Sequence, residues 1–241
     1  VLEKMKPDTA IIKAVLFDLD QTLVDFLHQK RESCRAAIRA MVQSGLPIAA
    51  KKAEKLLFEI YDRHGIEDPQ VFQRFLRKTS GRVDYKLLAK AVAAYRNLQR
   101  GLLKPYPHTK RVLSALQKRG YRLGVVSDAP RLKAHLRLAE LGLLDYFDVI
   151  VTLDDTGRLK PHPRPFQVAA RKLELKPDQI LFVGDNPERD ILGARNTGME
   201  TAWARYGYPK KYVGPQSKST SRSKPDYTLD KIQDLLRINF A

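Results

Sequence analysis

The chain has 241 residues, and its 44 Lys and Arg residues exceed its 27 Asp and Glu residues, which gives a formal net charge of +17. A hydrophobic content of 43% supports a sizeable core, while no apolar run reaches the roughly 20 residues that a membrane-spanning helix needs. The single cysteine, Cys34, excludes an internal disulfide, and the first residues lack the apolar region of a secretion signal. These features predict a cytoplasmic protein with no membrane segment.

The excess of positive charge favours partners that carry negative charge, such as phosphorylated metabolites or nucleic acid. The basic residues, for example the pair Lys51 and Lys52, are spread along predicted helices. They are not interleaved with aromatic residues, as they would be in a typical nucleic-acid-binding surface. This pattern favours a solvated, charge-rich surface over a dedicated nucleic-acid surface. Nucleic-acid binding stays a secondary hypothesis, and the sequence does not define an oligomeric state.

Five short apolar runs are typical of strands that are buried on both faces of a parallel sheet. Helical patterns separate the later runs, and proline or acidic residues stand at the start of these helices and glycine at their end. This alternation predicts an α/β fold with a Rossmann-like parallel-sheet core. The predicted strands are Ala14–Phe17, Leu123–Val126, Val149–Val151, Ile180–Val183 and Thr201–Ala204.

The stretch from Asp25 to Gly101 contains no strand-like run and shows repeated helical periodicity. Its helices are expected to break at Gly45–Pro47, at His64-Gly65 and at Ser80-Gly81. The sequence therefore predicts two domains: a catalytic core made of 1–24 and 102–241, and an all-helical cap made of 25–101 that is inserted after the first strand. Such an insertion is placed to cover the first loop as a lid.

Two features are expected near the C-terminus. The polar, basic run 214–224 is typical of a flexible surface loop. An amphipathic helix around Ile232, Leu235 and Leu236 then docks on the core.

The first predicted strand leads directly into Asp18-Leu19-Asp20-Gln21-Thr22. Asp18 and Asp20 are two residues apart, so an extended backbone presents both carboxylates on the same side. Open α/β sheets bind ligands at the carboxyl ends of their strands, and two close negative charges require a proton or a cation between them. This segment is therefore the first candidate for a functional site.

Three further polar elements follow predicted strands. Ser127 follows the second strand, Lys160 follows the third, and Asp185 with Asp190 follows the fourth. Each of them alone is a weak signal, because serine often caps a helix and a Lys-Pro pair often lies at an exposed helix entrance. Their order, each after a buried strand, makes the set specific.

With these four elements the chain resembles the phosphatases of the haloacid dehalogenase superfamily that carry a helical cap after the first motif. The resemblance extends from about Ile12 over nearly the whole chain. It implies that Asp18 is the nucleophile that forms an aspartyl-phosphate, and that Asp20 is the acid and then the base. It also implies that Lys160 neutralises charge at the reacting phosphate.

The resemblance also implies roles in binding. Thr22 would hold the first loop in register on the substrate side, and Ser127 would bind a phosphoryl oxygen together with Lys160. Asp18, Asp185 and the backbone carbonyl of Asp20 would hold Mg²⁺, with Asp190 supporting the metal or Lys160 from behind.

Two neighbouring residues have competing explanations. Asp128 lies beside Ser127 and is a candidate for substrate contact, but the cap of the following helix explains it more simply. His162, between two prolines, is expected to be exposed and not catalytic.

The chemistry of the residues supports the same reading. A carboxylate that attacks an anionic phosphate needs cations nearby, and Lys160 and a divalent ion would supply them. A ligand set of oxygen atoms, without a Cys or His cluster, favours Mg²⁺ over Zn²⁺.

We therefore expect a Mg²⁺-dependent phosphatase that hydrolyses a small phosphate monoester. A 2-haloacid dehalogenase is the first alternative, but such enzymes lack the second aspartate, which is present here as Asp20. Phosphomutases of the superfamily usually carry glycine where Thr22 stands. A basic nucleic-acid-binding protein with an idle catalytic set is the alternative from another class. The expected partner is a small phosphorylated metabolite whose identity the sequence does not give.

Overall fold

The computed structural model describes residues 11–208 and 224–238, and these residues form two compact units. The first unit, the core, comprises 11–25, 104–208 and 224–238, and the second, the helical domain, comprises 26–103. The expected surface loop at 214–224 lies outside the described residues, apart from its last residue.

The core is built on a six-stranded sheet with the order β3-β2-β1-β4-β5-β6, in which every neighbouring pair is parallel. The five predicted strands are confirmed with small changes in their bounds. The sixth, β6, was missed, because it has three residues and only Leu229 among them is buried. The strands are β1 (Ala14–Phe17), β2 (Arg122–Val126), β3 (Val149–Val151), β4 (Ile180–Gly184), β5 (Glu200–Ala204) and β6 (Tyr227–Leu229).

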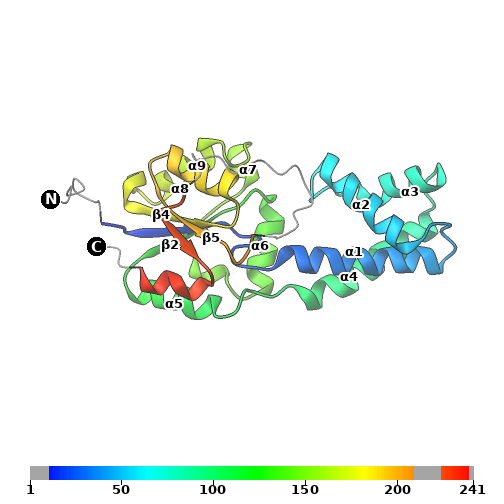
Figure 1. The fold of residues 1–241 in the computed structure, drawn as a ribbon, viewed down its shortest axis with the longest axis horizontal. Coiled ribbons are helices and arrows are strands. Elements are labelled where there is room, and N and C mark those ends of the chain that lie inside the picture. Colours follow the sequence, from blue (N-terminus) through cyan, green and yellow to red (C-terminus); the bar gives the residue numbers. More distant parts are fainter. Residues whose placement is uncertain (1–10, 209–223, 239–241) are drawn as a thin grey trace. The chain divides into compact units, whose positions relative to one another are not determined.

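Helices cover both faces of this sheet, as an α/β fold with buried strands requires. Figure 1 shows α8 (Pro163–Lys172) and α9 (Leu192–Asn196) on one side and α5 (Thr109–Lys118) on the other. On the first side Phe166 of α8 packs edge-on against Phe182 of β4, with ring centroids 5.0 Å apart. The remaining core helices are α6 (Arg131–Glu140) and the short α7 (Leu153–Thr156).

The strand register aligns the carboxyl ends at the centre of the sheet. Phe17, the last residue of β1, is paired with Val125 of β2 and with Val183 of β4. The chain extends the sheet from β1 in one direction through β2 and β3 and in the other through β4, β5 and β6. Strand order therefore reverses beside β1, the position at which open α/β sheets bind their ligands.

Several helical segments of the core differ from a regular α-helix, and two of them bear on the site or on the predictions. After β4 the chain forms a π-helical turn, Pro187–Ile191, before α9 begins. The expected C-terminal amphipathic helix is a 3₁₀-helix, Ile232–Arg237, and its Ile232 and Leu235 are buried.

The helical domain consists of α1 (Phe26–Gln43), α2 (Ala50–His64), α3 (Val71–Ser80) and α4 (Tyr85–Leu102). The predicted breaks fall between these helices. Gly81 ends α3 in a left-handed conformation, and the Asp84 side chain caps α4 by accepting from two backbone N–H groups. The domain has its own apolar core, in which Cys34 is fully buried. No helix in the described ranges combines the length and the apolar content that a membrane span requires.

Candidate active site

Asp18 is the first residue after the central strand β1. Its backbone N–H donates to the carbonyl of Val183 at 2.8 Å, so the sheet hydrogen bonding continues to this residue and fixes its position. Its side chain is buried, and the Thr22 hydroxyl lies 3.5 Å from Asp18 Oδ2. The loop between them turns through Gln21, which has a left-handed φ of 65°. Asp18 and Thr22 thus face each other inside one tight loop, as expected.

Lys160 places a buried ammonium group at the same edge of the sheet. Its Nζ lies 2.5 Å from Asp18 Oδ1 and 2.7 Å from Asp190 Oδ1, and it donates to the carbonyl of Val126 at 3.0 Å. Burial alone would lower the pKa of Lys160, but the charges of Asp18 and Asp190 outweigh burial and raise that pKa above its usual range. Lys160 is therefore a permanent cation between two carboxylates.

Asp185 and Asp190 enter the site from the segment after β4. Gly184 permits this arrangement, because a Cβ atom at Gly184 would collide with the Asp190 side chain. Asp190 Oδ2 accepts from the backbone N–H of Asn186 at 3.0 Å, which fixes the orientation of the carboxylate. Asp18, Asp185 and Asp190 each offer one carboxylate oxygen, and these three atoms lie within 4.8 Å of one another.

This carboxylate cluster has the properties of a cation site. Burial, together with the charges of Asp190 and Asp18, raises the pKa of Asp185 well above its usual range. Burial also raises the pKa of Asp18 to about 7, against the opposing effect of Lys160. Among the described residues, the buried Asp185 Oδ1 has no hydrogen-bond partner. A buried oxygen without a partner is costly, and a hard divalent cation would both satisfy it and lower the repulsion.

The residues present therefore fit Mg²⁺, with Asp18 and Asp185 as the carboxylate ligands. One carboxylate oxygen of Asp190 contacts Lys160 Nζ, and the other accepts from the Asn186 N–H. Asp190 therefore orients Lys160 and the segment at Asn186. The side chain of Asp20 is not part of the three-carboxylate cluster. Its expected contribution, a backbone carbonyl, stays a prediction.

Asp20 has a partner that the sequence did not suggest. Arg137 of α6 places its Nη1 at 2.6 Å from Asp20 Oδ2, and the Arg137 side chain is largely buried. An ion pair of this kind favours the charged form of a carboxylate. The carboxylate that is expected to act as the general acid thus lies in an ion pair.

Ser127 lies where it was expected, buried directly after β2. Its backbone N–H donates to Val151 at 2.9 Å, and its Oγ accepts from the N–H of Ala129 at 3.1 Å. The hydroxyl therefore supports the local turn, and its proton stays available to a ligand oxygen.

The expectation that Asp128 caps the next helix was wrong. Helix α6 begins at Arg131 after Pro130, and the N–H of Arg131 donates to Oδ2 of Asp154 at 2.6 Å. Asp128 instead accepts from the backbone N–H of Lys160 at 2.9 Å and pairs with Arg189 at 3.2 Å. Its carboxylate holds the Lys160 segment in place. His162 is exposed, as expected, and its Nδ1 caps α8 by accepting from the N–H of Arg164.

A second support for the Asp18–Thr22 loop comes from the segment after β5. The Tyr206 hydroxyl donates to the carbonyl of Thr22 at 2.8 Å, and Gln21 Nε2 donates to the carbonyl of Gly207 at 3.2 Å. The backbone of Gly207 lies so close to Gln21 that a Cβ atom there would overlap the Gln21 carbonyl oxygen. These residues carry no motif of their own and could not be predicted from the sequence.

Comparison with known proteins identifies the type of site. The family model described as haloacid dehalogenase-like hydrolase matches residues 15–204, a range that contains Asp18, Ser127, Lys160 and Asp185. The chain belongs to this family. It is an enzyme, a hydrolase of the haloacid dehalogenase type, and the resemblance expected from the four motifs is confirmed.

Individual members of the family are similar over almost their full length. Glyceraldehyde 3-phosphate phosphatase of Methanopyrus kandleri is 35% identical over 230 residues, which cover 95% of this chain and 97% of that protein. Pyrophosphatase PpaX of Bacillus thuringiensis is 31% identical over 236 residues, covering 94% and 96%. A crystal structure of a predicted phosphoglycolate phosphatase from Haemophilus somnus matches with a TM-score of 0.68 at 26% identity, covering 94% and 97%. The fold and the hydrolase class of this chain thus agree with its relatives.

Proposed function

We propose that this haloacid dehalogenase-like hydrolase is a Mg²⁺-dependent phosphatase that cleaves small phosphate monoesters through an aspartyl-phosphate on Asp18. The observation that carries the proposal is the contact of Asp18 with Lys160 inside a cluster of three buried carboxylates. A buried carboxylate beside a fixed cation is arranged to attack an anionic group without strong repulsion.

The first half of the reaction uses Asp18 and Asp20. A carboxylate oxygen of Asp18 attacks phosphorus, the bond between phosphorus and the ester oxygen breaks, and Asp20 gives a proton to the leaving oxygen. Lys160 offsets the negative charge, and the Ser127 hydroxyl donates to a phosphoryl oxygen. Mg²⁺, held by Asp18 and Asp185, supplies further positive charge when bound and favours the ionised form of Asp18.

The second half hydrolyses the intermediate. Asp20 removes a proton from a water molecule, whose oxygen attacks phosphorus, and the bond between phosphorus and Asp18 breaks. Inorganic phosphate leaves and Asp18 is restored. Since Asp20 acts as acid in one half and base in the other, it must change its proton state in each cycle. Release of its ion pair with Arg137 is therefore part of the proposed cycle.

A three-carbon sugar phosphate is the substrate to be tested first. Five curated relatives between 32% and 37% identical are named glyceraldehyde 3-phosphate phosphatase. Pyrophosphate is the second candidate, because other relatives are named pyrophosphatase. A cytoplasmic location, as expected above, agrees with a soluble metabolite as substrate.

Phosphate release with excess Mg²⁺ from glyceraldehyde 3-phosphate, pyrophosphate and an aryl phosphate tests the proposal. Halide release from a 2-haloacid tests the alternative. We expect phosphate release only, and none in excess chelator. Asp18→Asn should abolish turnover, whereas Asp178→Asn, which changes an exposed carboxylate, should keep the wild-type rate. Turnover by Asp18→Asn within tenfold of the wild type would refute the proposed nucleophile.

A further inference from the structure

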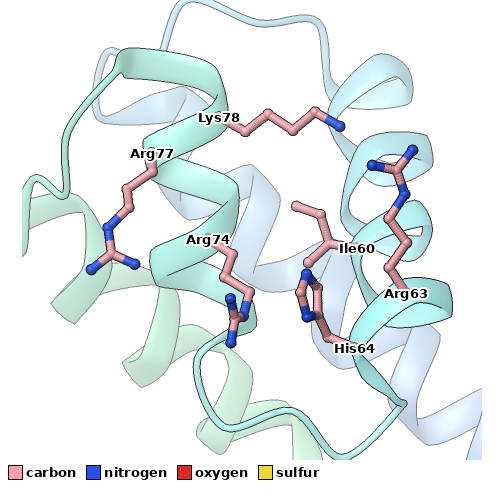
Figure 2. A pocket seen from close by; sticks show the side chains of 6 residues that line it. All are labelled: Ile60, Arg63, His64, Arg74, Arg77 and Lys78. Carbon is pink, nitrogen blue, oxygen red and sulfur yellow. The ribbon is translucent and has the colours of Figure 1, made fainter.

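A hollow of about 370 Å³ lies between α2 and α3, entirely within the helical domain. Figure 2 shows side chains from the two helices on opposite sides of it. Helix α2 contributes Ile60, Arg63 and His64, and helix α3 contributes Arg74, Arg77 and Lys78. Apart from Ile60, every residue that lines the hollow is basic. We name this hollow the basic pocket.

The charges of the basic pocket are mostly unbalanced. Arg74 pairs with Asp68 at 3.0 Å. In the part of the chain that the structure describes, Arg63, Arg77 and Lys78 form no ion pair. Of the four Arg and Lys side chains that line the hollow, only Arg74 therefore has a carboxylate partner among the described residues. Like charges that are held around one hollow repel each other, so this arrangement costs free energy unless an anion is bound.

A second hollow in the same domain provides an internal comparison. It is lined by four basic and three acidic residues, and Arg35 in it pairs with Glu54 at 2.9 Å. Its charges are thus nearly balanced, although it lies on the same strongly basic chain. The excess of basic residues in the basic pocket is therefore a local property and not only a reflection of the net charge.

Stabilisation of helix ends explains part of the pattern but not all of it. Arg63 and His64 lie in the last turn of α2, and Arg77 and Lys78 lie in the last turn of α3, where cations interact favourably with the helix dipole. Arg74 is the fourth residue of α3 and lies near its N-terminal end, where the helix dipole does not stabilise a cation. In Figure 2, Arg74 and Lys78 extend from α3 towards α2, whereas Arg77 turns away from the gap. Arg74 and Lys78 thus point into the space between the two helices.

We propose that the basic pocket binds the phosphate groups of a small, multiply phosphorylated molecule. Guanidinium groups bind phosphate oxygens in pairs, and an ammonium group adds a mobile point charge. The lining has no Phe, Tyr or Trp side chain on which a base could stack, which favours a ligand recognised by its phosphates over single-stranded RNA. The volume lies in the range of small-molecule pockets. The inference does not depend on the proposed phosphatase activity, because no lining residue belongs to the core.

Isothermal titration calorimetry of the full chain with inorganic tripolyphosphate, in chelator, tests this site. The charge-reversed variant Arg63→Glu/Lys78→Glu should bind at least tenfold more weakly than the wild type. The matched control Lys52→Glu/Lys86→Glu changes the net charge equally at exposed positions of α2 and α4 outside the pocket. It should stay within about twofold of the wild type, as expected for screened charges at a distance.

Three outcomes would overturn the proposal: no binding to the wild type, equal weakening in both double variants, or unchanged binding in the pocket variant. A parallel titration with ATP distinguishes a nucleotide from an inorganic polyphosphate, since both carry the same chain of phosphate groups. Equal affinity shows that the phosphates alone are recognised, and a large preference for ATP would contradict that. Binding of a single-stranded RNA oligonucleotide without binding of tripolyphosphate would replace the proposed ligand by a nucleic acid. Phosphatase turnover of the pocket variant should match the wild type.

Discussion

Arg137 Nη1 lies 2.6 Å from Asp20 Oδ2, so the carboxylate expected to act as the acid is paired with a largely buried guanidinium. This pair ties the first motif loop to α6, two parts of the chain separated by more than a hundred residues. It sets a condition for the proposed reaction, because an acid must be protonated before it can protonate the leaving group.

Removal of Arg137 should move the pH dependence of catalysis. In Arg137→Leu the Asp20 carboxylate loses a nearby positive charge that favours its ionised form. The limb of the kcat/KM profile that reports the protonated acid should therefore shift to higher pH. Arg111→Leu, which removes an exposed arginine on α5, should leave the profile unchanged. A uniform loss of rate without any shift would show that Arg137 has only a structural role.

The stability of the metal-free protein should fall as the pH rises. Burial raises the pKa of Asp18 from 3.8 to about 7 in the folded protein, and that of Asp185 is raised as well. Between pH 4 and 7 the folded protein therefore holds protons that the unfolded chain has released, so the free energy of unfolding decreases across this window. Thermal unfolding in chelator should show the decrease, and Asp18→Asn should flatten it. A melting temperature that rises from pH 4.5 to 7 would contradict the buried carboxylate cluster.

Removal of the Lys160 ammonium should destabilise the core. In Lys160→Met the carboxylates of Asp18 and Asp190 lose their shared cation, and breaking a buried ion pair in this way costs about 3–5 kcal/mol. Urea unfolding measures the loss. The double variant Lys160→Met/Asp190→Asn should recover part of it, since one unpaired charge is removed, and the exposed Lys118→Met serves as the control. A double variant less stable than the single one would contradict this account.

Gly207 should be required for catalysis although no reacting group is attached to it. A methyl group in Gly207→Ala would overlap the Gln21 carbonyl, so the loop that carries Asp18 and Asp20 must move. A displacement of about 1 Å at a reacting group can cost about 10²-fold in rate. Gly101→Ala is the matched control, because Gly101 lies in α4 with no atom near the added methyl group. Equal kcat values for the two variants would show that the loop adapts.

Asp185 should determine the response to Mg²⁺. In the wild type, Mg²⁺ should raise the melting temperature at pH 7, because it binds only the folded site. Asp185→Asn should lose most of that increase and lower turnover by at least 10²-fold, whereas Asp178→Asn should keep both. An undiminished thermal response in Asp185→Asn would place the cation elsewhere.

The sequence predicted the parts of the site that follow strands. Parallel strands bring their carboxyl ends to one edge of the sheet. A residue that follows a buried strand in the sequence is therefore expected at that edge, which is how we selected Asp18, Ser127, Lys160 and Asp185. Arg137 and Arg189 were missed, because each contacts the site from a helical segment and nothing nearby in the sequence marks which surface arginine turns inwards. The prediction for Asp128 was wrong for a related reason. A carboxylate just before a helix is a typical cap, but in the fold Asp128 accepts from the N–H of Lys160 and pairs with Arg189, both distant in the sequence.

The sole tryptophan of the chain, Trp203, donates its indole N–H to the backbone carbonyl of Asp185 at 2.7 Å. The chromophore is thereby joined by one hydrogen bond to the residue that is expected to hold the cation. Its emission comes from this one indole, without a contribution from any other tryptophan. We therefore expect the emission of Trp203 to change when a cation binds at Asp185, so that cation loading could be followed in real time on unlabelled protein.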